Sequence, residues 1–197
     1  MKSIPDHQGR REDFEREMLP HMTAVYNFAV RMIGDVDDAK DLVQETYIRA
    51  YRYFENFSLG TNARGWLVRI MRNLYINQYR KDTAAPEKVD YDEVENFYVN
   101  IRSSMVDGND LQEKLFGNLL EDEVSDALLE LPDEYRMVVV LCDVEGFTYA
   151  EVSETCEIPV GTVRSRLHRA RKILRDKLRE YALTHGFKHA NERIDED

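Results

Sequence analysis

Arginine recurs in one short stretch of this sequence, residues 159–172, at a spacing suited to binding a polyanion. If the stretch is helical, with about 100° between residues, its apolar side chains fall on one narrow stripe. That stripe consists of Val163, Leu167, Ala170 and Leu174. The opposite and flanking positions carry Arg164, Ser165, Arg166, His168, Arg169, Arg171 and Lys172. The pattern predicts a basic amphipathic helix, with a core on one side and an anionic partner on the other.

The residues before this stretch predict how the helix is entered. Thr148 and Glu151 have the spacing of a capping box, so a short helix should begin at Thr148, with Tyr149, Val152 and Cys156 on its apolar side. A connector at 156–158 follows, and Pro159 suits the first turn of the next helix. This order is typical of a helix-turn-helix, whose second helix enters the major groove of DNA. The alternative interpretation is an ordinary surface helix with solvated charges.

Helical periodicity also dominates the N-terminal part. One helix is expected around Phe14 to Met32, ending near Gly34, and a second at 36–54. The inner face of the second is predicted to be Ala39, Leu42, Val43, Thr46 and Ala50, and its outer side carries Asp38, Asp41 and Glu45. A third helix is expected at 62–80, with Leu67, Ile70, Met71 and Leu74 pointing inward. Further helices are expected at 121–131 and 132–144, so the fold class is all-α.

Charge is distributed unevenly along the chain. Acidic residues outnumber basic ones by 38 to 27, for a formal net charge of -11, which is unusual for a protein that binds DNA. Basic residues gather at 64–81 and 159–181, and an acidic stretch separates them. We therefore expect two small helical domains, at 1–82 and 119–184, joined by a flexible acidic linker at 83–118 and followed by a tail at 185–197.

The two cysteines and the apolar runs limit the remaining classes. Cys142 and Cys156 match no metal or redox spacing and are expected to be buried thiols. The apolar run at 137–142 is too short to span a bilayer, and no segment resembles a signal peptide. We expect a soluble cytoplasmic protein without a cofactor, a metal site, a small-molecule substrate or membrane insertion.

Three motifs together resemble the bacterial sigma-70 family of RNA polymerase sigma factors. DAKDLVQET at 38–46 looks like the segment that grips polymerase, and GWLVRIMRN at 65–73 is similar to the promoter-melting segment. Leu131-Pro132, GFTYAEV at 146–152 and VGTVRSRL at 160–167 look like the promoter-reading C-terminal domain. Their order and the small size of the chain match the extracytoplasmic-function (ECF) group, which keeps two helical domains.

The resemblance implies a function for each surface. In the C-terminal domain it implies recognition of the −35 element by Arg164, Ser165, His168 and Arg169, with phosphate contacts from Thr162, Arg166, Arg171 and Lys172. In the N-terminal domain it implies −10 recognition and melting, for which the candidates are Phe57, Trp66, Arg69, Arg72, Asn73, Asn77 and Arg80. Trp66 fits a core or a stacking role, and Phe57 fits packing on the domain or contact with a flipped base.

The same resemblance implies the partners. Asp38, Asp41, Gln44 and Glu45 would meet the clamp helices of the largest subunit of core RNA polymerase, and the C-terminal domain would meet the flap of the second-largest. An anti-sigma factor is a further expected partner, and no enzymatic activity is expected. Two alternatives remain. One is a DNA-binding regulator with the same C-terminal motif, and the other is a protein-interaction module that binds polymerase without supporting transcription.

Overall fold

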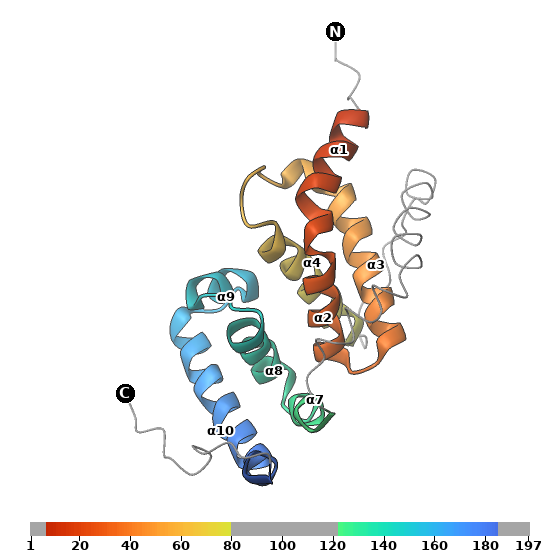
Figure 1. Cartoon of the computed structure of the whole chain (residues 1–197). Coiled ribbons are helices and arrows are strands. Elements are labelled where there is room, and N and C mark those ends of the chain that lie inside the picture. Colours follow the sequence, from red (N-terminus) through yellow and green to blue (C-terminus); the bar gives the residue numbers. More distant parts are fainter. Residues whose placement is uncertain (1–6, 80–121, 185–197) are drawn as a thin grey trace. The chain divides into compact units, whose positions relative to one another are not determined.

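The computed structural model describes residues 7–79 and 122–184, and every regular element in these two ranges is a helix. The chain divides into two compact units, one built on helices α1 to α4 and the other on α7 to α10 (Figure 1). The predicted all-α class is confirmed. Arg80, the predicted linker and the predicted tail lie outside the described residues, so the domain boundaries stay a prediction.

The described part of the N-terminal unit contains four α-helices and two short 3₁₀ turns. They are α1 (His7–Met18), η1 (Leu19–His21), α2 (Met22–Ile33), α3 (Val36–Arg52), η2 (Phe54–Asn56) and α4 (Ala63–Tyr79). The prediction of one continuous helix from Phe14 to Met32 is wrong, because the 3₁₀ turn η1 interrupts it. Pro20 lies in that turn, and proline has no amide hydrogen to donate to the preceding turn of an α-helix.

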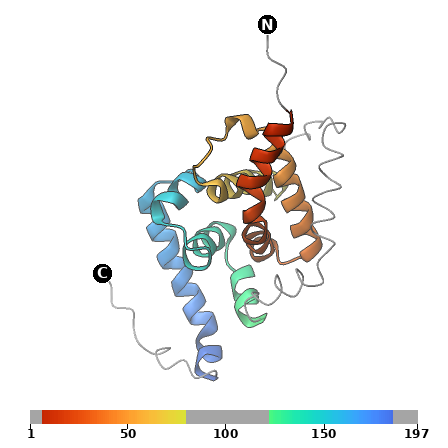
Figure 2. The ribbon, with the colours of Figure 1, turned by 45° about the horizontal axis from the view of Figure 1, so that its top comes forward.

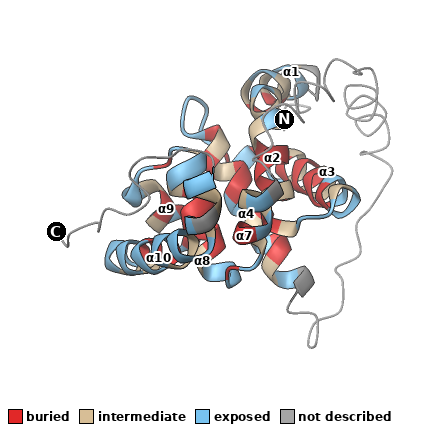
Figure 3. Cartoon of the chain, turned by 60° about the horizontal axis from the view of Figure 1, so that its bottom comes forward, coloured by how far each residue is buried: buried red, intermediate tan, exposed pale blue. Residues whose placement is uncertain are grey.

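The core of the N-terminal unit lies between α3, α4 and the first helices. The predicted inner face of α3 is buried at all five positions, and Leu67, Met71 and Leu74 of α4 are buried as predicted, whereas Ile70 is half-buried (Figure 3). The buried Tyr47 hydroxyl donates a hydrogen bond to the Met18 carbonyl at 3.1 Å, which ties α3 to the end of α1. Burial also raises the pKa of this phenol.

The C-terminal unit contains α7 (Asp122–Leu129), α8 (Asp133–Val139), the π-helical turn η3 (Val140–Val144), α9 (Tyr149–Cys156) and α10 (Val160–Thr184). Helix α10 packs along α8 and also contacts α7 and α9 (Figure 2). The helix predicted at 132–144 is present, but its last turn is wider than an α-helical one, since the Glu145 amide donates to the Val140 carbonyl five residues back, at 2.9 Å.

The two cysteines of this unit differ in burial. Cys156 is buried as predicted, but the prediction for Cys142 is wrong, because this residue lies in the turn η3 and its side chain is only half-buried. Burial raises the pKa of the Cys142 thiol to about 11, with a smaller contribution from Asp143. Both effects keep this thiol protonated at neutral pH.

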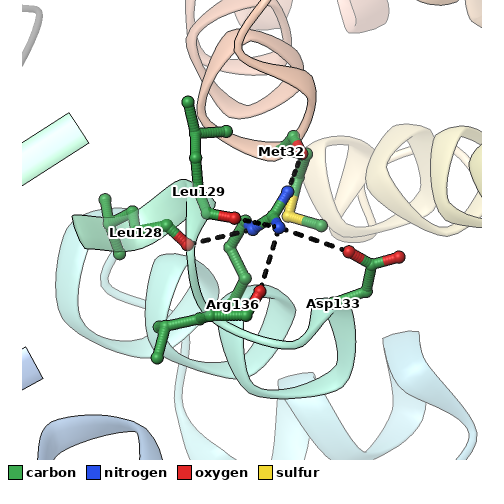
Figure 4. A network of polar contacts seen from close by, with 6 residues as sticks. Met32, Leu128, Leu129, Asp133 and Arg136 are labelled. Atoms are coloured by element: carbon green, nitrogen blue, oxygen red, sulfur yellow. Dashed lines mark hydrogen bonds and ion pairs between the residues drawn. The ribbon is translucent and has the colours of Figure 1, made fainter. Parts of the chain in front are cut away.

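The buried guanidinium of Arg136 on α8 closes the end of α7 (Figure 4). Its Nε donates to the Leu128 carbonyl at 3.0 Å, and its Nη2 donates to the carbonyls of Leu129 and Leu131 at 2.6 and 2.9 Å. Asp133 lies 3.3 Å from the same Nη2. Carbonyls in the last turn of a helix have no helical donor, and their partial negative charge favours a cation. Arg136 therefore holds α7 and α8 together, a role that its sequence context did not indicate.

Replacing Arg136 with Met should destabilise the C-terminal unit. Methionine replaces the apolar stem of the arginine, but the carbonyls at the end of α7 lose their donors, so we expect the free energy of unfolding to fall by about 3 kcal/mol. Arg136→Lys, which keeps the charge and part of the hydrogen bonding, should lie between this variant and the wild type. Urea unfolding of the full chain, followed by circular dichroism, measures the effect.

The matched control is Arg11→Met on α1, where the arginine is exposed and, among the described residues, hydrogen-bonds Glu15 on its own helix. This control should change the free energy of unfolding by less than about 0.5 kcal/mol. An Arg136→Met variant as stable as the Arg11→Met control would contradict the role given to the guanidinium.

Candidate nucleic-acid interface

A capping box begins helix α9, as the sequence predicts. The Thr148 hydroxyl accepts a hydrogen bond from the Glu151 amide at 3.2 Å, and the Glu151 carboxylate accepts one from the Thr148 amide at 2.8 Å. Both of these amide groups would otherwise lack a partner in the first turn. The start of the short helix is thereby determined by these two side chains.

A tight turn joins α9 to α10. Glu157 adopts a left-handed conformation with φ of 54°, and the Ile158 amide donates to the Ser153 carbonyl at 3.1 Å, which ends α9. The Pro159 carbonyl then accepts from the amides of Thr162 and Val163 at 2.8 and 3.1 Å, which starts α10. The two helices and this turn form the predicted helix-turn-helix.

Helix α10 has the two faces that the sequence predicts. Val163, Leu167 and Ala170 are buried, and Leu174, at the far end of the stripe, is half-buried. The exposed residues of the opposite and flanking sides are Arg164, Ser165, His168, Arg169, Arg171 and Lys172. Thr162 and Arg166 are half-buried. The structure thus brings the eight predicted −35 residues onto the solvent side of one helix.

Two arginines of this face form ion pairs with carboxylates of α8 and η3. Arg166 Nη2 lies 2.6 Å from Glu134 Oε2. Arg171 Nη2 and Nε donate to the two carboxylate oxygens of Asp143 at 2.6 and 3.0 Å. The hydrogen bonds to Asp143 raise the pKa of Arg171, so this guanidinium is charged at any physiological pH.

The other basic residues of the face fall into two groups. Two of them lie near an aromatic ring, and two make no polar contact within the described residues. The Arg164 guanidinium lies 6.0 Å from the centre of the Tyr149 ring, at the outer limit of a cation–π contact, and Arg169 Nη1 lies 3.4 Å from the Tyr135 hydroxyl. Within the described residues, the side chains of His168 and Lys172 make no hydrogen bond or ion pair. None of these four side chains forms an ion pair with a carboxylate of the described residues.

Tyr149 is placed differently from the prediction. The pattern puts it on the apolar side of α9 with Val152 and Cys156, and these two residues are indeed buried. Tyr149 instead remains 38% exposed and lies next to Arg164. Helical spacing alone could not reveal this, because the position of Arg164 depends on how α10 packs against α9.

Polar residues of α4 form a second candidate surface. Arg69, Asn73 and Asn77 are exposed at intervals of four residues, and the half-buried Arg72 donates to the Asn73 side-chain oxygen at 3.2 Å. Side chains four residues apart lie on the same face of a helix. Three of the predicted −10 residues thus share one face of α4.

The aromatic candidates of this unit pack on each other. Phe57 is only 8% exposed, and its ring stacks on Phe54 at 5.9 Å and lies tilted against the half-buried Trp66 at 5.2 Å. Of the two roles open to Phe57, the structure therefore supports packing on the domain. Leu59 is the most exposed large apolar residue of the loop that follows, and the sequence pattern did not single it out.

The acidic side of α3 is a third candidate surface. Asp38 and Asp41 are exposed, and their carboxylates make no hydrogen bond or ion pair within the described part of the chain. Glu45 pairs with Arg49 at 2.8 Å, and Gln44 is half-buried. Two unpaired carboxylates, one turn apart, are therefore available to a basic partner.

The described ranges hold neither a candidate metal site nor a candidate membrane-spanning helix. No group of three or more His, Cys, Asp or Glu side chains in them could hold a metal ion. None of the helices described there has the length and apolar character needed to cross a bilayer.

Two family models match the chain, one in each unit. The model described as "Sigma-70 region 2" matches residues 19–85, and "Sigma-70, region 4" matches residues 121–174. These matches cover α2, α3 and α4 in the first unit and the helix-turn-helix in the second.

Named relatives are similar over most of the chain. The ECF RNA polymerase sigma factor SigE of Mycolicibacterium smegmatis is 38% identical over 89% of this chain, and the chain spans 65% of the length of that protein. SigW of Bacillus subtilis, also an ECF RNA polymerase sigma factor, is 35% identical over 79% of this chain and 83% of its own length.

Two solved structures are similar to this chain in fold. The sigma factor RpoE of Bartonella quintana, solved in complex with the anti-sigma factor NepR, is 27% identical, with a TM-score of 0.63 over 85% of this chain and 97% of that one. CnrH, solved with the cytosolic domain of CnrY, is similar in fold alone, with 22% identity and a TM-score of 0.53 over 88% of each chain.

Replacing Phe57 with Ala tests whether this ring supports the loop before α4. Loss of the contacts with Phe54 and Trp66 should lower the free energy of unfolding by about 3 kcal/mol. Phe57→Leu, which keeps most of the volume, should cost about 1 kcal/mol. Denaturant unfolding of the full chain measures both, and an Ala variant as stable as the wild type would mean that the ring is available for another role.

Proposed function

This chain belongs to the extracytoplasmic-function group of the sigma-70 family of RNA polymerase sigma factors, and we propose on that premise that it directs core RNA polymerase to particular promoters. It acts as a transcription initiation factor and catalyses no reaction itself. The observation that carries the proposal is the exposed basic face of α10, which lies in the segment matched by the region 4 model.

The outer face of α10 reads the −35 element. Arg164 and Arg169 are the base-reading candidates, because both are exposed and neither is paired with a carboxylate in the described residues. A guanidinium can donate two hydrogen bonds to guanine in the major groove. Ser165 and His168 flank them, and Thr162 at the start of the helix is placed to bind phosphate.

The N-terminal unit binds the −10 element and assists strand opening. Asn73 and Asn77 offer hydrogen-bonding groups to unstacked bases, and Arg69 and Arg72 offer charge to the phosphates. The packing of Phe57 and Trp66 supports a positioning role for these rings beneath the loop. Like Arg69 and Arg72, Arg80 is proposed to assist melting; it lies outside the described residues.

The acidic side of α3 binds core polymerase. Asp38 and Asp41 supply unpaired charge, and Gln44 and Glu45 extend the same surface toward basic residues on the clamp helices of the largest subunit. A second contact joins the C-terminal unit to the flap of the second-largest subunit. An anti-sigma factor is a further proposed partner, since the similar RpoE was solved in complex with one.

Run-off transcription with purified core polymerase on genomic fragments tests the proposal. Defined transcripts should appear only when the chain and core polymerase are both present. If the chain instead binds specific duplexes tightly by itself, with no gain from polymerase and no transcript, it is a DNA-binding regulator.

Arg164→Ala and Arg169→Ala should each weaken transcription from the promoters found in this way. One lost arginine–guanine contact corresponds to roughly a 5- to 150-fold loss. Both variants should still co-purify with core polymerase. Arg11→Ala, an exposed arginine of the other unit, serves as the control and should transcribe normally. Loss of polymerase binding by the α10 variants would contradict the assignment.

Reversing the charge of the α3 surface should impair assembly with core polymerase. Asp38→Lys with Asp41→Lys places two cations opposite basic residues of the proposed partner, so we expect at least about a tenfold loss of affinity in a pull-down or anisotropy titration. Glu12→Lys, an exposed acidic position on α1, is the matched control. Equal affinity for the double variant and the wild type would refute this interface.

A further inference from the structure

Two carboxylates of the C-terminal unit form ion pairs with arginines on the solvent side of α10. Glu134 lies in the first turn of α8 and pairs with Arg166, while Asp143 lies in η3 and pairs with Arg171. The contact between Arg171 and Asp143 uses two parallel hydrogen bonds, at 2.6 and 3.0 Å. A guanidinium offers the same two-donor geometry to a phosphate.

Both pairs are accessible to a competing anion. The side chains of Arg166 and Glu134 are 27% and 49% exposed, and those of Arg171 and Asp143 are 48% and 32% exposed. Ion pairs with this much solvent contact contribute little to stability. A phosphate that approaches can therefore replace the carboxylate in each ion pair, although breaking the ion pair costs some free energy.

The remaining basic residues of the same face differ in this respect. Arg164 and Arg169 have aromatic neighbours, and within the described residues His168 and Lys172 have no hydrogen-bonding or ionic partner. Within the described residues, Glu134 and Asp143 form ion pairs with Arg166 and Arg171 and with no other basic residue of this face. Flanking cations favour the phosphates, which contribute affinity for any sequence.

We propose that Glu134 and Asp143 compete with DNA phosphates for Arg166 and Arg171, and thereby lower the affinity of the C-terminal unit for duplex DNA of any sequence. The inference rests on the proposed DNA-reading function of α10. Its consequence is that selection of a site depends more on the base-reading arginines and less on attraction to the backbone.

The opposite role would be a positioning one, in which each carboxylate holds its arginine in place for a DNA contact. The two roles differ in sign. Removal of a competing carboxylate strengthens DNA binding, whereas removal of a positioning carboxylate weakens it. The salt dependence separates them further, because each additional phosphate contact steepens the slope of log K against log salt by about 0.9.

The experiment uses Glu134→Gln and Asp143→Asn in the full chain, titrated by fluorescence anisotropy against a labelled short duplex of random sequence at several salt concentrations. We expect each variant to bind about two- to fivefold more tightly than the wild type, with a slope steeper by about one phosphate contact. Asp126→Asn on α7 makes the same charge change at an exposed position that pairs with neither arginine, and should have a much smaller effect.

A double variant tests whether Arg171 carries the gain. Adding Arg171→Gln to Asp143→Asn should abolish the tighter binding, because the released guanidinium is then missing. A thermal melt of every variant shows whether it is folded. A gain that persists in the double variant would overturn the proposal for this pair.

Other outcomes also decide the question. Unchanged or weaker binding by both single variants, including the absence of any binding at the lowest salt, overturns the inference. Run-off transcription with the wild-type chain judges the proposed function separately. A wild type that transcribes, combined with unaltered duplex binding by the variants, refutes only the competition by the carboxylates.

Discussion

The burial of one apolar stripe determines the orientation of α10, and the rest of the candidate interface depends on it. Val163, Leu167 and Ala170 are buried against the other helices of the C-terminal unit. Full burial of a Leu or Val side chain stabilises a fold by about 1.5–3 kcal/mol, so a rotation of α10 that exposed this stripe would cost several of these contributions. The same rotation would move every arginine of the outer face, because all of them share one helix.

The short elements around α10 serve the same orientation. The capping box at Thr148 starts α9, and the left-handed residue Glu157 ends it, so the chain enters α10 through a turn with little freedom. Arg136 closes α7 beneath these helices through three carbonyls. Each device satisfies backbone groups that would otherwise lack a partner within their helix, and together they support the position of α10.

In an acidic protein that binds DNA, the carboxylates must be placed so that they do not repel the DNA phosphates. On α3 the unpaired carboxylates of Asp38 and Asp41 face outward, where the proposed partner is a basic surface of polymerase. On α8 and η3 the carboxylates of Glu134 and Asp143 pair with Arg166 and Arg171 of α10. If a large polymerase supplies most of the DNA affinity, weak binding by the chain alone is no disadvantage. The net charge of -11 is consistent with such a division of work.

The sequence by itself determined the helices, their faces and the capping box, because these features depend on residues three or four positions apart. The break at Pro20 was missed, because the prediction followed the apolar periodicity across Phe14 to Met32 and not the local signal of the proline. Tertiary structure alone decided which arginines of α10 carry a carboxylate. Arg166 and Glu134 are 32 residues apart and Arg171 and Asp143 are 28 apart, so no local pattern relates them. The exposure of Tyr149 beside Arg164 and the burial of the Arg136 charge have the same origin, because each depends on how separate helices pack.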